Sequence, residues 1–216
     1  MIIRCSSLPV LMTNPRNKGD REAGNLSQTA KSEIEKLVKE ELFGFKSFFS
    51  TKETKKGIEC EDAAIELYNS VFFTDYKKNT ERRTDEVITG ECDVDAPDEI
   101  IDMKCPWSKK TFPACPYNIP IKDYEMQLRG YMKLWDKPKA TVCYCLMDTP
   151  IHLIPNWESD ELHEMGNVEE QLRITKLTIY RDAEKEQMII DKVNKATEHA
   201  NWYRNEILLK SESYFQ

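Results

Sequence analysis

The stretch 90–108, GECDVDAPDEIIDMKCPWS, constrains the fold most, because it predicts a β-hairpin with a charged face. Its centre, 96–99, reads Ala-Pro-Asp-Glu. This is turn composition, since proline fixes φ at the first central position and aspartate favours turns. The runs that flank the turn, 87–95 and 100–105, are therefore the two expected strands.

The register of this hairpin predicts a cluster of charge. With Pro97 and Asp98 at the turn centre, Asp93 faces Asp102 across the hairpin. Side chains alternate along a strand, so Lys104 shares the face of Asp102, while Ile101 points the other way, into a core. Met103 points to the core as well. Two carboxylates and an ammonium group are thus expected on one face.

Like charges that face each other destabilise a sheet unless something compensates them. A divalent cation would do so, since hard cations take carboxylate oxygens. The alternative is a solvated hairpin face that is merely charged. Asp95 shares the face of Asp93 but opposes Ile100 beside the turn, so it is not expected to be a principal ligand.

The length of 216 residues suits one domain, 1–216, with a sizeable core. Hydrophobic residues make up 40% and charged residues 32%, which is ordinary for a soluble globular protein. No apolar run approaches the ~20 residues of a membrane span, and the N-terminus is too short and polar for a secretory signal. Seven cysteines without regular spacing favour reduced thiols and a cytoplasmic location.

The net charge of −7 does not point to nucleic-acid binding, so any contact with DNA must come from local positive groups. Three groups lie before and after the acidic residues of the hairpin: Lys52, Lys55 and Lys56; Lys77, Lys78, Arg82 and Arg83; and Lys109 with Lys110. A solvated surface is the alternative for each of them.

Hydrophobic periodicity predicts an α/β or α+β fold, with a mixed central sheet built on the hairpin and flanked by helices. Ser32 and Glu35 fit a capping box for the first helix, Gly44 is its expected end, and Asp182 is the expected cap of the last helix. The expected helices are 29–43, 56–73, 121–136, a weaker one at 158–173, and a long one after 182; the further strands are 140–147 and 174–180.

Glu61 lies on the core-facing side of the second helix, with Ala64 and Ile65. A carboxylate there is costly unless it is paired or bound to a metal. The alternative is that Glu61 lies at the rim of the core and reaches water.

Asp93 followed by Asp102-x-Lys104 resembles the signature of the PD-(D/E)xK nuclease superfamily. The run IIDMKCPWS is closer still to the phage-type recombination exonucleases, the lambda exonuclease group, in which an acidic residue precedes x-Lys-Cys-Pro-aromatic. Asp102 stands where glutamate is more usual, and the shorter carboxylate still reaches a metal. The resemblance covers roughly 57–147 and implies a restriction-endonuclease-like core.

This resemblance implies a Mg²⁺-dependent deoxyribonuclease, with Mn²⁺ as a substitute, most simply an exonuclease that processes DNA ends for recombination or repair. Asp93, Asp102 and the Met103 carbonyl correspond to metal ligands, and Lys104 to the group that orients or deprotonates the attacking water. The spacing Gly57-x-x-x-Glu61 resembles the family's preceding helix, which selects Glu61 over Glu59 for a second metal or an ordered water. Gln127, in Tyr124-x-x-Gln127-x-x-x-Tyr131, corresponds to a glutamine near the metal-bound water or the scissile phosphate.

For DNA, the resemblance implies that Arg4 and Ser6 hold a 5′-phosphate. The further expected DNA contacts are Lys55, Lys56, Arg82, Arg83, Lys109 and Tyr131. The implied partners are double-stranded DNA ends, a single-strand annealing protein and further copies of the chain in a ring, in a bacterial or phage-infected cell. Two alternatives remain: a DNA-binding or recombination-partner module with an impaired site, and a restriction-type endonuclease.

Overall fold

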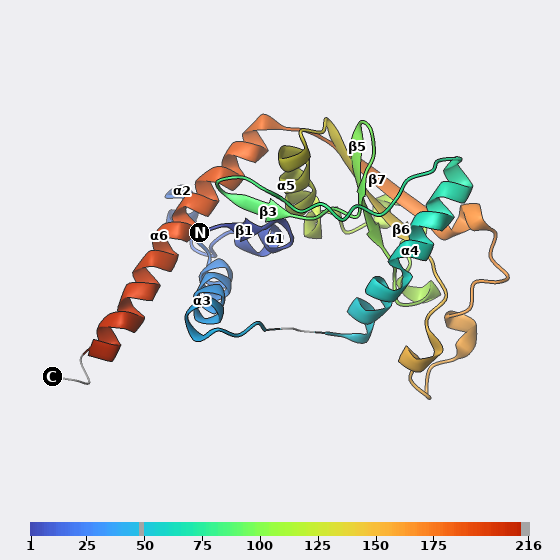
Figure 1. Cartoon of the computed structure of the whole chain (residues 1–216), viewed down its shortest axis with the longest axis horizontal. Coiled ribbons are helices and arrows are strands. Elements are labelled where there is room, and N and C mark those ends of the chain that lie inside the picture. Colours follow the sequence, from blue (N-terminus) through green and yellow to red (C-terminus); the bar gives the residue numbers. More distant parts are fainter. Residues whose placement is uncertain (48–49, 213–216) are drawn as a thin grey trace.

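The computed structural model describes residues 1–47 and 50–212 (Figure 1). The helices are α1 (Leu8–Leu11), α2 (Lys18–Glu22), α3 (Gln28–Phe43), α4 (Lys52–Phe72), α5 (Glu125–Trp135) and α6 (Ala183–Glu212). The strands are β1 (Ile3–Arg4), β2 (Arg83–Thr84), β3 (Ile88–Gly90), β4 (Val94–Asp95), β5 (Glu99–Lys104), β6 (Lys139–Cys145) and β7 (Ile174–Tyr180). The mixed α/β class expected from the sequence is confirmed. None of the described helices is long and apolar enough to cross a membrane.

The strands form two sheets. The larger has the order β4-β5-β6-β7, in which β5 and β6 run parallel and the outer pairs are antiparallel. The smaller has the order β1-β3-β2. The run 87–95, expected as one strand, is therefore divided between the two sheets. Its first part pairs with β1 and β2, and only Val94 and Asp95 pair with β5.

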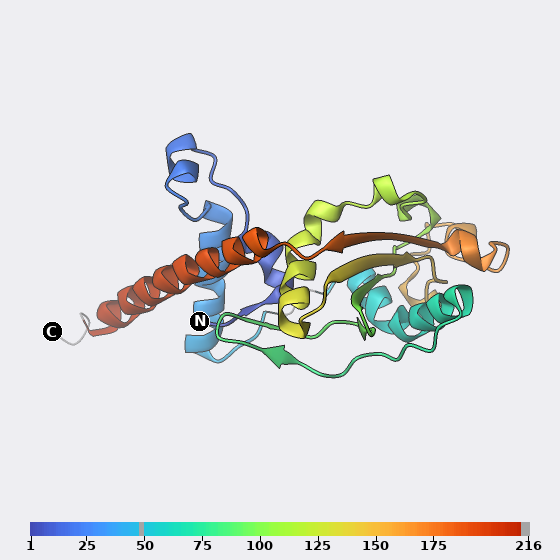
Figure 2. The same cartoon turned by 90° about the horizontal axis from the view of Figure 1, so that it is seen from above.

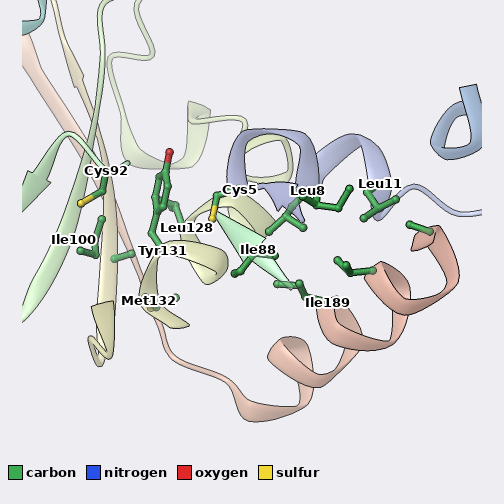
Figure 3. Close-up of a cluster of buried hydrophobic side chains, with 14 of the residues drawn as sticks. Cys5, Leu8, Leu11, Ile88, Cys92, Ile100, Leu128, Tyr131, Met132 and Ile189 are labelled. Atoms are coloured by element: carbon green, nitrogen blue, oxygen red, sulfur yellow. The ribbon is translucent and has the colours of Figure 1, made fainter. Parts of the chain in front are cut away.

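Helices cover both faces of the larger sheet. One face of β5 and β6 packs on α4 through Ile101, Met103 and Cys143, together with Ala64 and Tyr68 of the helix. The other face packs toward α5 in the larger core, which continues to α1, β3 and α6 (Figure 3). Helix α6 packs along α3 and then extends away from the sheet (Figure 2). The residues of β5 that alternate toward α5 include Asp102 and Lys104.

Local signals explain where most elements begin and end. Helix α3 starts one residue before its expected start, because the Ser27 side chain accepts a hydrogen bond from the Ala30 N–H. The predicted capping box at Ser32 is therefore wrong, since Ser32 is already within the helix. Gly44 ends the helix in the left-handed conformation, and Asp182 caps α6, both as expected.

The predicted helix at 158–173 is wrong. This segment has short 3₁₀ turns at Asp160–Leu162 and Glu170–Arg173 instead. It folds around the buried His163, whose ring nitrogens bond to Thr149 Oγ1 and Glu158 Oε2. The Met165 N–H donates to the Asp148 carboxylate. These side-chain contacts replace the hydrogen bonds that a helix would have made.

Helix α5 lies close to the N-terminal segment. A Cβ atom at Gly130 would lie 2.8 Å from Cys5 Sγ and 2.8 Å from Leu8 Cδ1, so only glycine allows this approach. The same helix carries Gln127, which this packing fixes relative to β5.

Candidate active site

A pocket with a volume of about 640 Å³ lies where α4 meets the end of β5. This size is in the range of ligand-binding pockets. Its wall includes Glu61 from α4, Asp93, Lys104 and the following loop through Trp107. Tyr124 and Tyr144 complete the wall. Three of the sequence-predicted catalytic residues thus line one pocket.

The predicted hairpin register is confirmed. Val94 pairs with Ile101 and Asp95 with Ile100, so Asp93, one residue before β4, stands opposite Asp102. β4 covers only Val94 and Asp95, so on that side of β5 no strand lies beside Met103. The Met103 N–H donates to Asp93 Oδ2 at 2.6 Å. This bond fixes the Asp93 carboxylate beside β5.

Asp102 connects the catalytic strand to α5. Its Oδ2 atom lies 2.5 Å from Lys104 Nζ, and its Oδ1 atom accepts a hydrogen bond of 3.2 Å from Gln127 Nε2. Gln127 also donates to the Tyr131 hydroxyl, and Lys104 Nζ lies 3.4 Å from the Met103 carbonyl. The fold therefore brings together four residues that the sequence had grouped: Asp93, Asp102, Lys104 and Gln127.

The pKa values of Asp93 and Lys104 are both raised, for different physical reasons. Burial, and then the nearby charge of Asp102, raise the pKa of Asp93 to about 7. Desolvation opposes the charged form of Lys104, but the Asp102 and Asp93 carboxylates outweigh it and raise the pKa of that ammonium group. A buried carboxylate with a raised pKa beside a second charged group, as at Asp93, is a frequent feature of active sites.

Glu61 lines the pocket, as the helical pattern suggested, and its charge contributes to the raised pKa of Asp93. Its Oε1 atom pairs with Lys78 Nζ at 3.2 Å. Glu59, the rejected alternative, instead points to His152 at the exposed surface. The choice of Glu61 therefore agrees with its position.

The oxygen atoms of this site fit a hard divalent cation. Asp93 and Asp102 are two carboxylates beside the main chain of Met103, and oxygen ligands of this kind suit Mg²⁺. Among the residues that the structure describes, no three His, Cys, Asp or Glu side chains are gathered closely enough to hold a metal by themselves. The fit is to a cation such as Mg²⁺, which keeps several waters and needs few protein ligands.

Two predicted DNA contacts are wrong. Lys56 is fully buried, and its Nζ donates to the carbonyls of Trp107 and Met147 and to Thr149 Oγ1. Tyr131 is also buried, with its hydroxyl bonded to Gln127. Both residues lie on helix faces that pack inward, so neither side chain reaches a bound strand.

The other expected DNA contacts are at the surface. Lys55 is exposed, whereas Arg82 and Arg83 are paired with Glu91 and Glu81. The remaining three differ in position: Lys109 Nζ donates to the Glu161 carbonyl, Ser6 is exposed, and Arg4 lines a separate hollow with Leu37 and Phe45. The structure does not bring Arg4 into the pocket of Asp93.

Sequence reasoning did not single out Tyr144. The Tyr144 hydroxyl lies 2.8 Å from that of Tyr124 at the pocket wall. The only sequence signal was a tyrosine within the otherwise mostly apolar run 140–147. The pairing of Lys104 with Tyr144 on adjacent strands exists only in the folded sheet.

No protein-family model and no curated protein sequence matches this chain. Among solved structures, it is similar to a phage-related exonuclease from Haemophilus somnus 129PT, with 36% identity, a TM-score of 0.84, and coverage of 98% of this chain and 96% of that one. It also shares its fold with LHK-Exo, an alkaline exonuclease from Laribacter hongkongensis, at 13% identity and a TM-score of 0.67, over 99% of this chain and 94% of that one. The same enzyme in complex with dAMP gives 14% identity, a TM-score of 0.68 and the same coverage.

Proposed function

Because this chain belongs to the family of phage-related exonucleases and is itself a DNA exonuclease, we propose that it hydrolyses DNA ends by a metal-dependent reaction at the Asp93–Asp102–Lys104 site. One observation carries this proposal: the side chains of Asp93, Asp102, Lys104 and Gln127 come together around strand β5. We propose the whole chain, 1–216, as one nuclease domain.

Each residue of the site has a distinct role in this proposal. Lys104 orients the attacking water and offsets phosphate charge, since its ammonium group is held in place by Asp102. Gln127 fixes Asp102 from the side of α5, and the Met103 N–H fixes Asp93. Glu61 completes the acidic wall of the pocket and positions an ordered water or a second cation.

Asp93, Asp102 and the Met103 carbonyl would hold Mg²⁺, or Mn²⁺ in its place. When bound, such a cation supplies Lewis-acid stabilisation of the charge that develops on the phosphate oxygens. Neutralising the two facing carboxylates also removes the repulsion that raises the pKa of Asp93. The chemistry of the donor set supports this choice of metal.

The proposed substrate is a double-stranded DNA end, which is processed for recombination or repair. Six surface residues remain proposed DNA contacts: Lys55, Arg82, Arg83, Lys109, Arg4 and Ser6. A ring of several copies and a single-strand annealing partner are proposed from the family resemblance, and the mass of the native protein in solution tests the ring.

The test is digestion of linear and of closed circular DNA, each with Mg²⁺, with Mn²⁺ and with excess chelator. We expect linear DNA to be shortened only with the metals, and closed circles to remain intact. Undiminished cleavage in chelator would contradict metal dependence. Cleavage of closed circles would favour the restriction-type endonuclease, and retention of DNA without shortening would favour a binding module.

Salt dependence tests the DNA contacts separately. Each phosphate that the protein neutralises contributes a slope of ~0.9 in log K against log salt on duplex DNA. A flat response would mean that Lys55, Arg82, Arg83 and Lys109 are ordinary surface charges.

A further inference from the structure

Two tyrosine hydroxyls meet at the pocket wall. Tyr124 lies at the start of α5 and Tyr144 on β6, and their hydroxyl oxygens are 2.8 Å apart. The rings meet edge to face, with centroids 6.3 Å apart at 74°. Both residues line the pocket that contains Asp93 and Lys104.

The hydroxyl of Tyr144 is not explained by packing. The residue is 8% exposed, and a phenylalanine would fill the same core position without burying a polar group. Burial, and then the bond to Tyr124, raise the pKa of this hydroxyl, so it stays protonated at neutral pH. Tyr144 is therefore a permanent hydrogen-bond donor in this wall.

The two hydroxyls have two O–H donors, and the hydrogen bond between them needs only one. Each is one donor and an acceptor, and the shared hydrogen bond consumes a single proton. Within the described part of the chain, neither hydroxyl has another hydrogen-bonding partner. One O–H donor thus remains for an acceptor in the pocket.

The neighbouring charge indicates which acceptor this is. Lys104 pairs with Tyr144 across the parallel strands β5 and β6. Its Nζ atom lies 5.3 Å from the centre of the Tyr124 ring. The same wall therefore offers a cation and a neutral donor, while Lys104 offsets the charge of Asp102. Phosphate oxygens accept from both kinds of group.

We propose that the paired hydroxyls of Tyr124 and Tyr144 form a phosphate-binding element, which donates a hydrogen bond to a non-bridging oxygen of the DNA phosphate bound beside Lys104. This assignment rests on the proposed function. It makes Tyr144, a strand residue, part of substrate binding, and it predicts that the two hydroxyls act as one unit.

The test compares wild type with Tyr144→Phe, Tyr124→Phe and the double variant on linear duplex DNA. Each change removes one oxygen atom and leaves the ring in place. Loss of a hydrogen bond to a charged group predicts a fall in kcat/KM of about 10- to 100-fold for each single variant. Because the pair acts as a unit, the double variant should lose no more than the larger single effect.

The matched control is Tyr68→Phe, which changes a buried tyrosine in the core on the other face of the sheet. It should leave both kcat/KM and melting temperature unchanged. A second readout, the affinity for short duplex DNA by fluorescence anisotropy in chelator, should fall for both pocket variants and not for the control.

The inference is overturned if Tyr144→Phe and Tyr124→Phe both stay within twofold of wild type in kcat/KM and in DNA affinity. Multiplication of the two single losses in the double variant would overturn the paired unit. If Tyr144→Phe does not fold, the partly exposed Tyr124→Phe decides. A wild type that never shortens linear DNA contradicts the proposed function instead, and the anisotropy measurement still decides this inference.

Discussion

Two lysines of this protein, Lys56 and Lys104, differ in burial and in their partners. Lys56 is fully buried, and among the described residues its ammonium group donates only to two carbonyls and a hydroxyl. Lys104 is partly exposed, side chain 26%, and contacts the Asp102 carboxylate. Burial lowers the pKa of Lys56, whereas for Lys104 the carboxylates outweigh desolvation and raise it.

The difference in partners indicates a structural role for Lys56 and a functional role for Lys104. The three partners of Lys56 lie after β5 and after β6, so this lysine joins α4 to the ends of both strands. Lys104 projects into the pocket beside two acids and leaves room for a ligand. Burial alone therefore does not identify a functional lysine; acidic partners at a cavity do.

The strongest test of this contrast is Lys104→Met. We expect kcat to fall by about 10²- to 10⁴-fold, because a positioned proton-transfer group is lost. Nucleotide release from linear DNA with Mg²⁺ measures the effect. Lys139→Met, which removes an ion pair with Asp98, is the control and should stay near wild type. Near-normal turnover of Lys104→Met would make this lysine a surface charge.

The carboxylates that distinguish Lys104 are the next test. Asp93→Asn and Asp102→Asn should each abolish most activity and weaken Mg²⁺ binding, as measured by calorimetry. Asp95→Asn is the matched control and should keep most activity. Asp95 Oδ1 lies 2.7 Å from Lys137 Nζ, and neither residue lines the cavity. An inactive Asp95→Asn with an active Asp93→Asn would shift the site by two residues.

Lys56→Met should affect stability rather than chemistry. The Met147 carbonyl and the Thr149 hydroxyl lose a donor, which costs about 1–3 kcal/mol in the free energy of unfolding. The relief of a buried charge offsets part of this cost. Urea unfolding measures it. A loss of turnover above 100-fold at unchanged stability would assign Lys56 to the active site after all.

The smallest effect concerns pH. The pKa of Lys56 is lower in the folded protein than in the unfolded chain, so the unfolded chain binds more protons between the two values and stability rises with pH there. The cost is complete below the folded pKa and is removed as pH approaches ~10.4, the unfolded value. The difference in melting temperature between wild type and Lys56→Met should therefore shift toward wild type as the pH rises from neutral. A constant difference would contradict the lowered pKa.

Much of the site was predictable because it depends on local rules. Turn composition at Pro97 and Asp98 fixed the register, and alternation then placed Asp102 and Lys104 on one face. The helical period placed Glu61 toward the pocket. The segment 158–173 was not predictable, because side-chain bonds to His163 and Asp148 override a weak helical pattern.

By itself, the sequence determined the hairpin, its register and the acidic-x-Lys strand, since these follow from residues that are neighbours along the chain. Only the tertiary structure decided that Lys56 and Tyr131 are buried, and that Tyr144 meets Tyr124. The physical reason is that burial and pairing are properties of the surroundings. A lysine or tyrosine carries the same side chain in every protein, and the elements packed against it decide whether that side chain meets a carbonyl, a carboxylate or water.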